Sequence, residues 1–302
     1  MDRKDEGLIP DVLARVLTGG RLKFIYLVPT YQNPSGRTLP LDRRQAVAAL
    51  LKRYRALLIE GNPYGGLRWG GRARPPIKSL ATERMVYVGT LSKLFAPGLR
   101  IGDGIAPEAI RKKLVIVKQG PDLQTSTFNQ ALAAEYLPGG HRQRHQPCVL
   151  ALYGPRGRAM RNSLEWHFPA EFHWSRPEGG MRVWVQGPER LDMDEVHQDA
   201  VARQTVFVPG HLFCPGGGGR STRRPHFTLP GPDDIRRVVK TLAEIIRDHS
   251  PRPHRDGIRP LKEAGFATIS PGTTQPIRET RYQGAAKGSK MRPVLASRFF
   301  KA

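Results

Sequence analysis

Two kinds of hydrophobic pattern alternate along the first hundred residues. Continuous apolar runs occur at "KFIYLVP" (23–29), "ALLIE" (56–60) and "MVYVGT" (85–90), and "LRIGDGIA" (99–106) is a fourth run, interrupted by glycines. Such runs are typical of strands buried on both faces of a parallel sheet. Between the first two, "LDRRQAVAALLKRY" (41–54) has the periodicity of an amphipathic helix. The alternation predicts an α/β, three-layer domain with a mostly parallel sheet.

The pattern changes after about residue 125. Two segments have helical periodicity, 126–137 and a long stretch over 144–168 that we expect Gly154 and Pro155 to interrupt. Shorter strand patterns and a closing amphipathic helix follow, at 179–185, 205–210, 223–230 and 233–249. This order of elements predicts a small α+β C-terminal domain.

The chain therefore divides into three expected parts. Residues 1–135 form a partial large domain and 136–249 a small domain. Residues 250–302 have no hydrophobic periodicity and are rich in proline, glycine and basic residues. A segment of that composition buries too little apolar surface to fold, so we expect a basic, disordered tail.

Composition sets limits on the class of protein. The 302 residues are 39% hydrophobic, which is enough for a buried core. No run approaches the roughly 18 apolar residues of a membrane span, and the polar start "MDRKDEGLIP" is unlike a signal peptide. We therefore expect a soluble, cytoplasmic protein. Cys148 and Cys214 have no metal or redox spacing, so small buried thiols are expected.

The net charge of +23 suits a nucleic acid or an anionic membrane as partner. Its distribution argues against both, because residues 250–302 carry 11 Lys and Arg against 3 Asp and Glu. The sequence has no helix-turn-helix pattern, zinc finger or interleaved aromatic and basic patch. We interpret the charge as a solvated surface plus a basic tail, with no nucleic-acid or membrane partner indicated.

Three polar side chains follow the predicted strands of the first domain. Asn33, Tyr64 and Lys93 each come shortly after a strand, where ligands collect in parallel sheets. Lys93 is followed seven positions later by Arg100, in the otherwise apolar stretch "YVGTLSKLFAPGLRIG" (87–102). A lysine near other cations and away from water has a lowered pKa, so its neutral amine can attack a carbonyl.

Five ordered motifs carry a resemblance to a known family. They are "PTYQNPSGRTL", "IEGNPYGGLRW", "GTLSKLFAPGLRIG", "RPEGGMRVWV" and "VFVPGHLF…GGGR". Their order and spacing resemble the fold type I, pyridoxal-phosphate-dependent aminotransferases. The likeness is greatest to the aminoadipate-aminotransferase-like branch, which also forms the C-terminal half of MocR-type regulators. It covers most of residues 5–248.

The resemblance implies a cofactor site. Lys93 would form the Schiff base with pyridoxal 5'-phosphate, as cofactor ligand and catalytic residue. Arg100 would bind the phosphate through its fixed fork of donors, with the hydroxyls of Thr90 and Ser92 as further donors.

The same resemblance implies roles for three further residues. Asn33 and Tyr64 would hydrogen-bond the phenolic oxygen of the cofactor ring. Arg224, together with Asn33, would bind the α-carboxylate of the substrate, although Arg223 could be mistaken for it by one step of register. Each residue also has an ordinary structural reading: Asn33 as a turn residue, Tyr64 as a half-buried core aromatic and Arg224 as a surface charge.

Several positions depart from the family pattern. Gly61 stands where the family has the aspartate that pairs with the ring nitrogen of the cofactor. Glu60 is adjacent, but on a strand its side chain points to the opposite face. Asp103 replaces an aromatic on a strand that we expect to be buried. Arg182 and Pro225 are expected to interrupt strands.

The start of the chain also departs from the family. The matched region resembles the C-terminal two-thirds of an aminotransferase, so we expect the segment that binds phosphate at a helix N-terminus to be missing. Its absence would expose a sheet edge and an apolar face.

Three functions follow from these expectations. The first is a homodimeric aminotransferase that passes an amino group between an amino acid and a 2-oxo acid, impaired by Gly61. The second is a non-catalytic effector-binding module of a MocR-type transcription regulator. The third is an inactive remnant. The intact set of Lys93, Arg100 and Arg224 leaves the first two open, and Gly61 favours the second.

Overall fold

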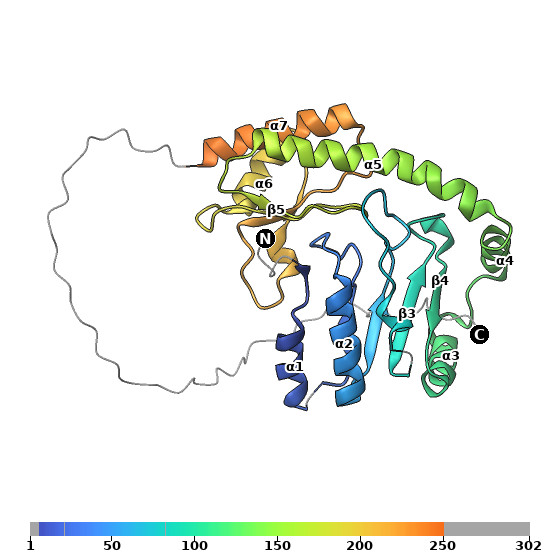
Figure 1. Cartoon of the computed structure of the whole chain (residues 1–302). Coiled ribbons are helices and arrows are strands. Elements are labelled where there is room, and N and C mark those ends of the chain that lie inside the picture. Colours follow the sequence, from blue (N-terminus) through green and yellow to red (C-terminus); the bar gives the residue numbers. More distant parts are fainter. Residues whose placement is uncertain (1–5, 21, 82, 251–302) are drawn as a thin grey trace, which may run out of the picture. The chain divides into compact units, whose positions relative to one another are not determined.

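A four-stranded sheet carries the first half of the chain in the computed structural model, which describes residues 6–20, 22–81 and 83–250 (Figure 1). Its strands, in spatial order, are β1 (Ile25–Leu27), β2 (Leu58–Gly61), β3 (Met85–Thr90) and β4 (Gly102–Ile105). The first three strands are parallel and β4 is antiparallel to β3. The predicted mostly parallel sheet is therefore confirmed, with all four strands where the apolar runs placed them.

Two helices pack with this sheet. α2 (Leu41–Tyr54) has the predicted bounds, and α1 (Pro10–Thr18), which we did not predict, packs beside it. Proline suits the first turn of α1 because the amide there has no partner within the helix. The shared core consists mainly of aliphatic side chains from both helices and the strands, including Leu13, Leu17, Val47, Leu51, Leu58 and Met85.

A buried arginine on α2 fixes the loop that follows β1. The Arg44 side chain is fully buried, and its Nη2 donates to the carbonyl oxygen of Pro29 at 2.9 Å and to Oγ1 of Thr30 at 2.8 Å. Its Nε donates to the carbonyl oxygen of Leu39 at 2.8 Å. Because buried carbonyls need partners, Arg44 anchors both ends of the loop that carries Asn33.

A second sheet lies in the C-terminal half. Its order is β5 (His173–Trp174), β6 (Val185–Gln186), β8 (Thr222–Arg224) and β7 (Val208–Pro209), with antiparallel pairs throughout. These strands are shorter than the predicted ones. Four further helices are α3 (Glu108–Asp122), α4 (Thr127–Tyr136), α6 (Met193–Ala202) and α7 (Pro232–His249), of which α3 and α6 were not predicted.

The expected strand interruptions are present. β8 ends at Arg224, just before Pro225, whose ring cannot donate to a ladder. Arg182 lies outside β6 and forms only an isolated bridge with His226. Pairing continues beyond the strands through single contacts, such as the bond from the amide of Val183 to the carbonyl oxygen of Pro225.

The expected break in the long helix is wrong. α5 runs without interruption over His141–His167, through Pro147, Gly154 and Pro155, and lies beside α7 (Figure 1). Packing accounts for its continuity. A Cβ atom at Gly157 would lie 2.6 Å from Cζ2 of Trp69, so the helix approaches this ring as closely as only glycine allows. Tertiary contacts therefore outweigh the helix-breaking proline.

Two further expectations about single segments can be checked. Cys148 is exposed on α5, so the expected buried thiol is wrong there, and Cys214 is partly exposed. The predicted tail, from residue 251 onward, lies outside the described residues. None of the described helices combines the length and apolar composition needed to cross a membrane.

Candidate functional site

Asn33 and Arg224 come from the two different sheets and meet at one hydrogen bond. Nη1 of Arg224, at the end of β8, donates to Oδ1 of Asn33, in the loop after β1, at 2.7 Å. Nε of Arg224 is buried and has no hydrogen-bond partner among the described residues. Burial, and then the nearby Arg182 cation, lower the pKa of Arg224. The guanidinium therefore has unused donors in a partly desolvated place, which suits a carboxylate.

The neighbouring Arg223 faces the other way. Its side chain is fully buried, and its guanidinium carbon lies 4.5 to 5.7 Å from the ring centres of Phe168, Phe172 and Phe207. Burial lowers the pKa of Arg223 to about 9. Alternation along β8 thus separates the two arginines, and Arg224 is the one on the side of Asn33.

Tyr64 lies in the turn after β2 and is 6% exposed, so it is more buried than the ordinary reading supposed. The guanidinium of Arg182 lies over its ring, 5.0 Å from the centre. Leu94, the residue after Lys93, packs against the cluster that contains Tyr64, Tyr31 and Leu67. Packing of Leu94 thus holds the Lys93 loop beside the Tyr64 turn.

The loop after β3 carries the predicted amine and phosphate ligands. Oγ1 of Thr90 lies 3.0 Å from Oγ of Ser92 and accepts a hydrogen bond from the amide of Ser92 at 3.1 Å. Lys93 is half-buried and makes no hydrogen bond, ion pair or ring contact within the described part of the chain. Arg100 is exposed and donates to the carbonyl oxygen of Pro97 at 3.1 Å.

Glu60 is the acidic residue next to Gly61 on β2. Glu60 is fully buried and accepts hydrogen bonds from the amides of Ile77 at 3.0 Å and Lys78 at 2.8 Å. Burial raises its pKa, and these two bonds oppose the rise. The expectation that Glu60 faces away from the position of the missing aspartate is therefore confirmed, and Glu60 serves to anchor the turn at residues 77–79.

A tyrosine occupies the space beside Gly61. A Cβ atom built on Gly61 would lie 3.0 Å from the hydroxyl oxygen of Tyr26 and 3.3 Å from Cγ2 of Val28. Tyr26 belongs to β1, where it is directly paired with Ile59 of β2. The hydroxyl of Tyr26 is thus the polar group nearest to a side chain at position 61, a feature that the sequence alone did not indicate.

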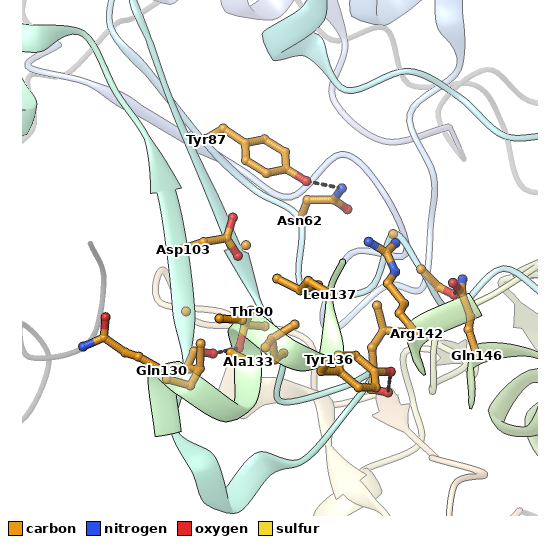
Figure 2. A pocket seen from close by; sticks show the side chains of 18 of the residues that line it. Asn62, Tyr87, Thr90, Asp103, Gln130, Ala133, Tyr136, Leu137, Arg142 and Gln146 are labelled. Atoms are coloured by element: carbon orange, nitrogen blue, oxygen red, sulfur yellow. Dashed lines mark hydrogen bonds between the residues drawn. The ribbon is translucent and has the colours of Figure 1, made fainter. Parts of the chain in front are cut away.

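A pocket of about 610 Å³ lies close to this region but is separate from most of it (Figure 2). Of the residues predicted to bind the cofactor or substrate, only Thr90 lines it. Asp103 also lines it, and the expected burial of this residue is wrong, since it is exposed. Partial burial of its carboxylate nevertheless raises the pKa of Asp103.

The donor set fits pyridoxal phosphate in all but one respect. A partnerless amine at Lys93, hydroxyl and guanidinium donors at Ser92 and Arg100, and unused donors at Arg224 match an aldehyde, a phosphate and a substrate carboxylate. The acid that would face the ring nitrogen is absent at Gly61.

Comparison with known proteins shows the family of the chain. The model of the family described as aminotransferase class I and II matches residues 11–220. The chain is 40% identical to Aromatic-amino-acid aminotransferase 1 of Thermococcus litoralis over 250 residues, which cover 81% of this chain and 60% of that protein. Its fold matches that of LysN, the alpha-aminoadipate aminotransferase of Thermus thermophilus complexed with N-(5'-phosphopyridoxyl)-L-leucine. The TM-score is 0.77 at 32% identity, over 81% of this chain and 64% of that one.

Transcriptional regulators are also among the proteins that the chain matches. A protein described as the uncharacterized HTH-type transcriptional regulator YisV of Bacillus subtilis is 29% identical over 246 residues, which cover 80% of this chain and 50% of that protein. The chain spans roughly three-fifths of the length of the aminotransferases it matches and half of this regulator.

Proposed function

We propose, from the premise that this chain belongs to the class I and II aminotransferases, that it binds pyridoxal phosphate through Lys93 and transfers an amino group between an amino acid and a 2-oxo acid. When bound, this cofactor supplies an aldehyde that reacts with amines and a ring that withdraws electrons from the attached carbon. The hydrogen bond between Arg224 and Asn33 is the observation that carries the proposal, because it brings two predicted site residues together from the two sheets.

Each side chain has a definite task in this proposal. Nζ of Lys93 holds the cofactor and carries the proton to and from the α-carbon of the substrate. The hydroxyl of Ser92 and the guanidinium of Arg100 bind the phosphate. Arg224 binds the substrate carboxylate, and its bond to Asn33 fixes the orientation of the guanidinium before the substrate arrives.

Gly61 makes the proposed reaction slow. A carboxylate beside the ring nitrogen would raise the pKa of that nitrogen and keep it protonated, which strengthens electron withdrawal. Glycine cannot do so, and Glu60 is committed to the amides of Ile77 and Lys78. The neutral hydroxyl of Tyr26 is the polar group nearest to position 61.

The proposal is tested by following the amino group itself. The protein is incubated with pyridoxal phosphate, ¹⁵N-labelled L-glutamate and phenylpyruvate, and labelled phenylalanine is measured by mass spectrometry. We expect slow transfer that Lys93→Ala abolishes and Lys113→Ala, at an exposed lysine of α3, leaves unchanged. Equal transfer by the Lys93→Ala variant would refute the assigned role.

The absence of an acidic side chain at Gly61 favours a second function, that of a non-catalytic effector-binding module. If the ring nitrogen is left unprotonated, the site can bind the cofactor and amino acids without turning them over, as an effector-binding module of a regulator requires. In that case the ¹⁵N assay shows no transfer, whereas amino acids still change the absorbance of the bound cofactor in the wild type and not in Lys93→Ala.

We also propose that the chain is cytoplasmic and forms a homodimer, as the family resemblance implies. Exposed apolar side chains on β1, β4 and α3 support an interface, among them Tyr26, Ile105, Ile116 and Val117. Light scattering after size-exclusion chromatography tests the dimer, and a monomer at micromolar concentration would contradict it.

A further inference from the structure

The pocket of about 610 Å³ is lined by residues of β3, β4, α4 and α5 and of the turn after β2 (Figure 2). Tyr87 and Gly89 of β3 and Asp103 of β4 form one wall. Arg142 and Gln146 of α5 are four residues apart, so they project from the same face of the helix toward the pocket. Nε2 of Gln146 donates to the carbonyl oxygen of Gly66 at 2.7 Å and thereby ties this wall to the turn after β2.

Three charged side chains line this pocket, and one of them, Arg68, donates through Nη1 to the carbonyl oxygen of Gly71 at 3.0 Å. The other two are opposite in sign and do not touch. Asp103 and Arg142 both line it, and they lie on opposite sides of it in Figure 2. No ion pair within 4.0 Å joins either side chain to another among the described residues. They are nevertheless close enough for the Arg142 cation to lower the pKa of Asp103, against the larger effect of burial. Each charge therefore keeps its capacity to bind a ligand group of opposite sign.

The carboxylate of Asp103 packs against a glycine, Gly89. Gly89 is directly opposite Asp103 in the antiparallel pair, and a Cβ atom there would lie 2.4 Å from Oδ1 of Asp103. The carboxylate thus lies against bare backbone, and any larger residue at position 89 would displace it. This close approach fixes the acidic end of the pocket.

A polar pair, Asn62 and Tyr87, also lines the pocket. Nδ2 of Asn62 donates to the hydroxyl oxygen of Tyr87 at 2.8 Å, as Figure 2 shows. Because this oxygen accepts that bond, the hydroxyl proton of Tyr87 is left to donate elsewhere. The rest of the lining is largely apolar, and includes Leu91, Leu94, Ala133, Leu137 and Leu150.

We propose that this pocket is a second ligand site that binds a free α-amino acid with an apolar side chain. Asp103 receives the ammonium group, Arg142 receives the carboxylate, and the aliphatic side chains of the lining contact the side chain of the ligand. A zwitterion satisfies both facing charges at once, whereas an amine or an acid alone leaves one of them unpaired. The volume lies within the range of small-molecule sites.

This inference goes beyond the proposed transfer reaction, since the pocket contains neither Lys93 nor Arg224. The test is therefore made without cofactor and in an Arg224→Gln background, so that amino acids are not bound at the candidate reaction site. Binding of L-phenylalanine, L-leucine and L-methionine is measured by titration calorimetry. Phenethylamine and 3-phenylpropanoate, each lacking one charge, serve as matched ligands.

We expect L-phenylalanine to bind at least about tenfold more tightly than either single-charge analogue, the scale of one charge-assisted hydrogen bond. Asp103→Asn and Arg142→Gln should each weaken its binding by about tenfold or more. Arg144→Gln, two residues along α5 and outside the pocket lining, should not. Melting curves confirm that each variant is folded.

Two results would overturn the assignment. One is the absence of binding for all three amino acids. The other is binding that Asp103→Asn and Arg142→Gln leave unchanged. Neither result depends on the transfer assay, which reports on Lys93 alone.

Discussion

Arg224 and Asn33 are 191 residues apart in the sequence and 2.7 Å apart at Nη1 and Oδ1 in the structure. The asparagine belongs to a loop that Arg44 holds from α2, and the arginine ends a strand of the second sheet. Both partners are thus placed by rigid elements, which is the arrangement that oriented binding of a carboxylate requires.

The first prediction concerns this pair. Arg224→Gln should raise the Michaelis constant for the amino acid substrate by about tenfold or more, because it removes the charge that pairs with the carboxylate. Asn33→Ala should have a smaller effect in the same direction, since the charge remains but its orientation is lost. Steady-state rates with glutamate check both. Arg220→Gln, at an exposed arginine paired with Asp192, is the control.

The second prediction concerns Arg223, which is buried among phenylalanine rings with Nε and Nη2 lacking partners in the described chain. Arg223→Met should stabilise the protein by about 1 to 3 kcal/mol, because unsatisfied buried polar groups are removed and the volume is kept. Urea unfolding measures this. A loss of stability would show that the guanidinium contributes a favourable interaction.

The pH dependence of that difference gives an independent check. Burial lowers the pKa of Arg223 to about 9 in the folded state, well below its ordinary value. Above about pH 9 the unfolded state binds more protons at this residue, so its penalty to the folded state shrinks as pH rises. The advantage of Arg223→Met should therefore be constant below about pH 9 and fall above it. An advantage that stays constant to about pH 11 would contradict the lowered pKa.

The third prediction concerns two positions in α5, Pro155 and Gly157. Pro155 is exposed within a continuous helix, so Pro155→Ala should restore a backbone hydrogen bond and stabilise the protein by up to about 3 kcal/mol. Gly157→Ala should destabilise it instead, because the new Cβ would meet the ring of Trp69. Thermal melts of both variants compare the effects. Stabilisation by Gly157→Ala would indicate that the helix stands farther from Trp69.

The elements that could be predicted are those whose structure is determined by the residues of the same segment. α2 has the expected bounds because its apolar period is unbroken, and alternation placed Glu60 on the correct side of β2. Continuity of α5 could not be predicted, since it depends on packing against α7 and Trp69. The role of Arg44 was also hidden, because nothing in a helical arginine shows that carbonyls from two distant loops will surround it.

The candidate site residues were predicted from sequence motifs. Three features of the site could not be predicted, because they depend on the three-dimensional structure. The choice between Arg223 and Arg224 follows from which face of β8 each occupies, and adjacent arginines cannot be told apart without that register. The hydroxyl of Tyr26 beside Gly61 depends on the pairing of β1 with β2. The pocket at Asp103 depends on where α4 and α5 lie.

The fourth prediction concerns Gly61. Gly61→Asp should raise the rate of amino-group transfer by about tenfold or more, since each unit by which the pKa of the ring nitrogen rises corresponds to about 1.4 kcal/mol. The Cβ atom of the new side chain would lie 3.0 Å from the hydroxyl of Tyr26, and the end of that side chain can move aside by a few tenths of an ångström. Gly61→Asn, of the same size without the charge, is the control and should give no comparable gain.

The fifth prediction tests the central claim, that Lys93 holds the cofactor. The protein is mixed with pyridoxal phosphate, reduced with borohydride and digested, and the modified lysines are identified and quantified by mass spectrometry. We expect the label to saturate on the peptide containing Lys93, to be lost from it in Lys93→Ala, and to remain there in Lys113→Ala. Labelling spread evenly over the surface lysines, or a specific label retained elsewhere in Lys93→Ala, would contradict the account.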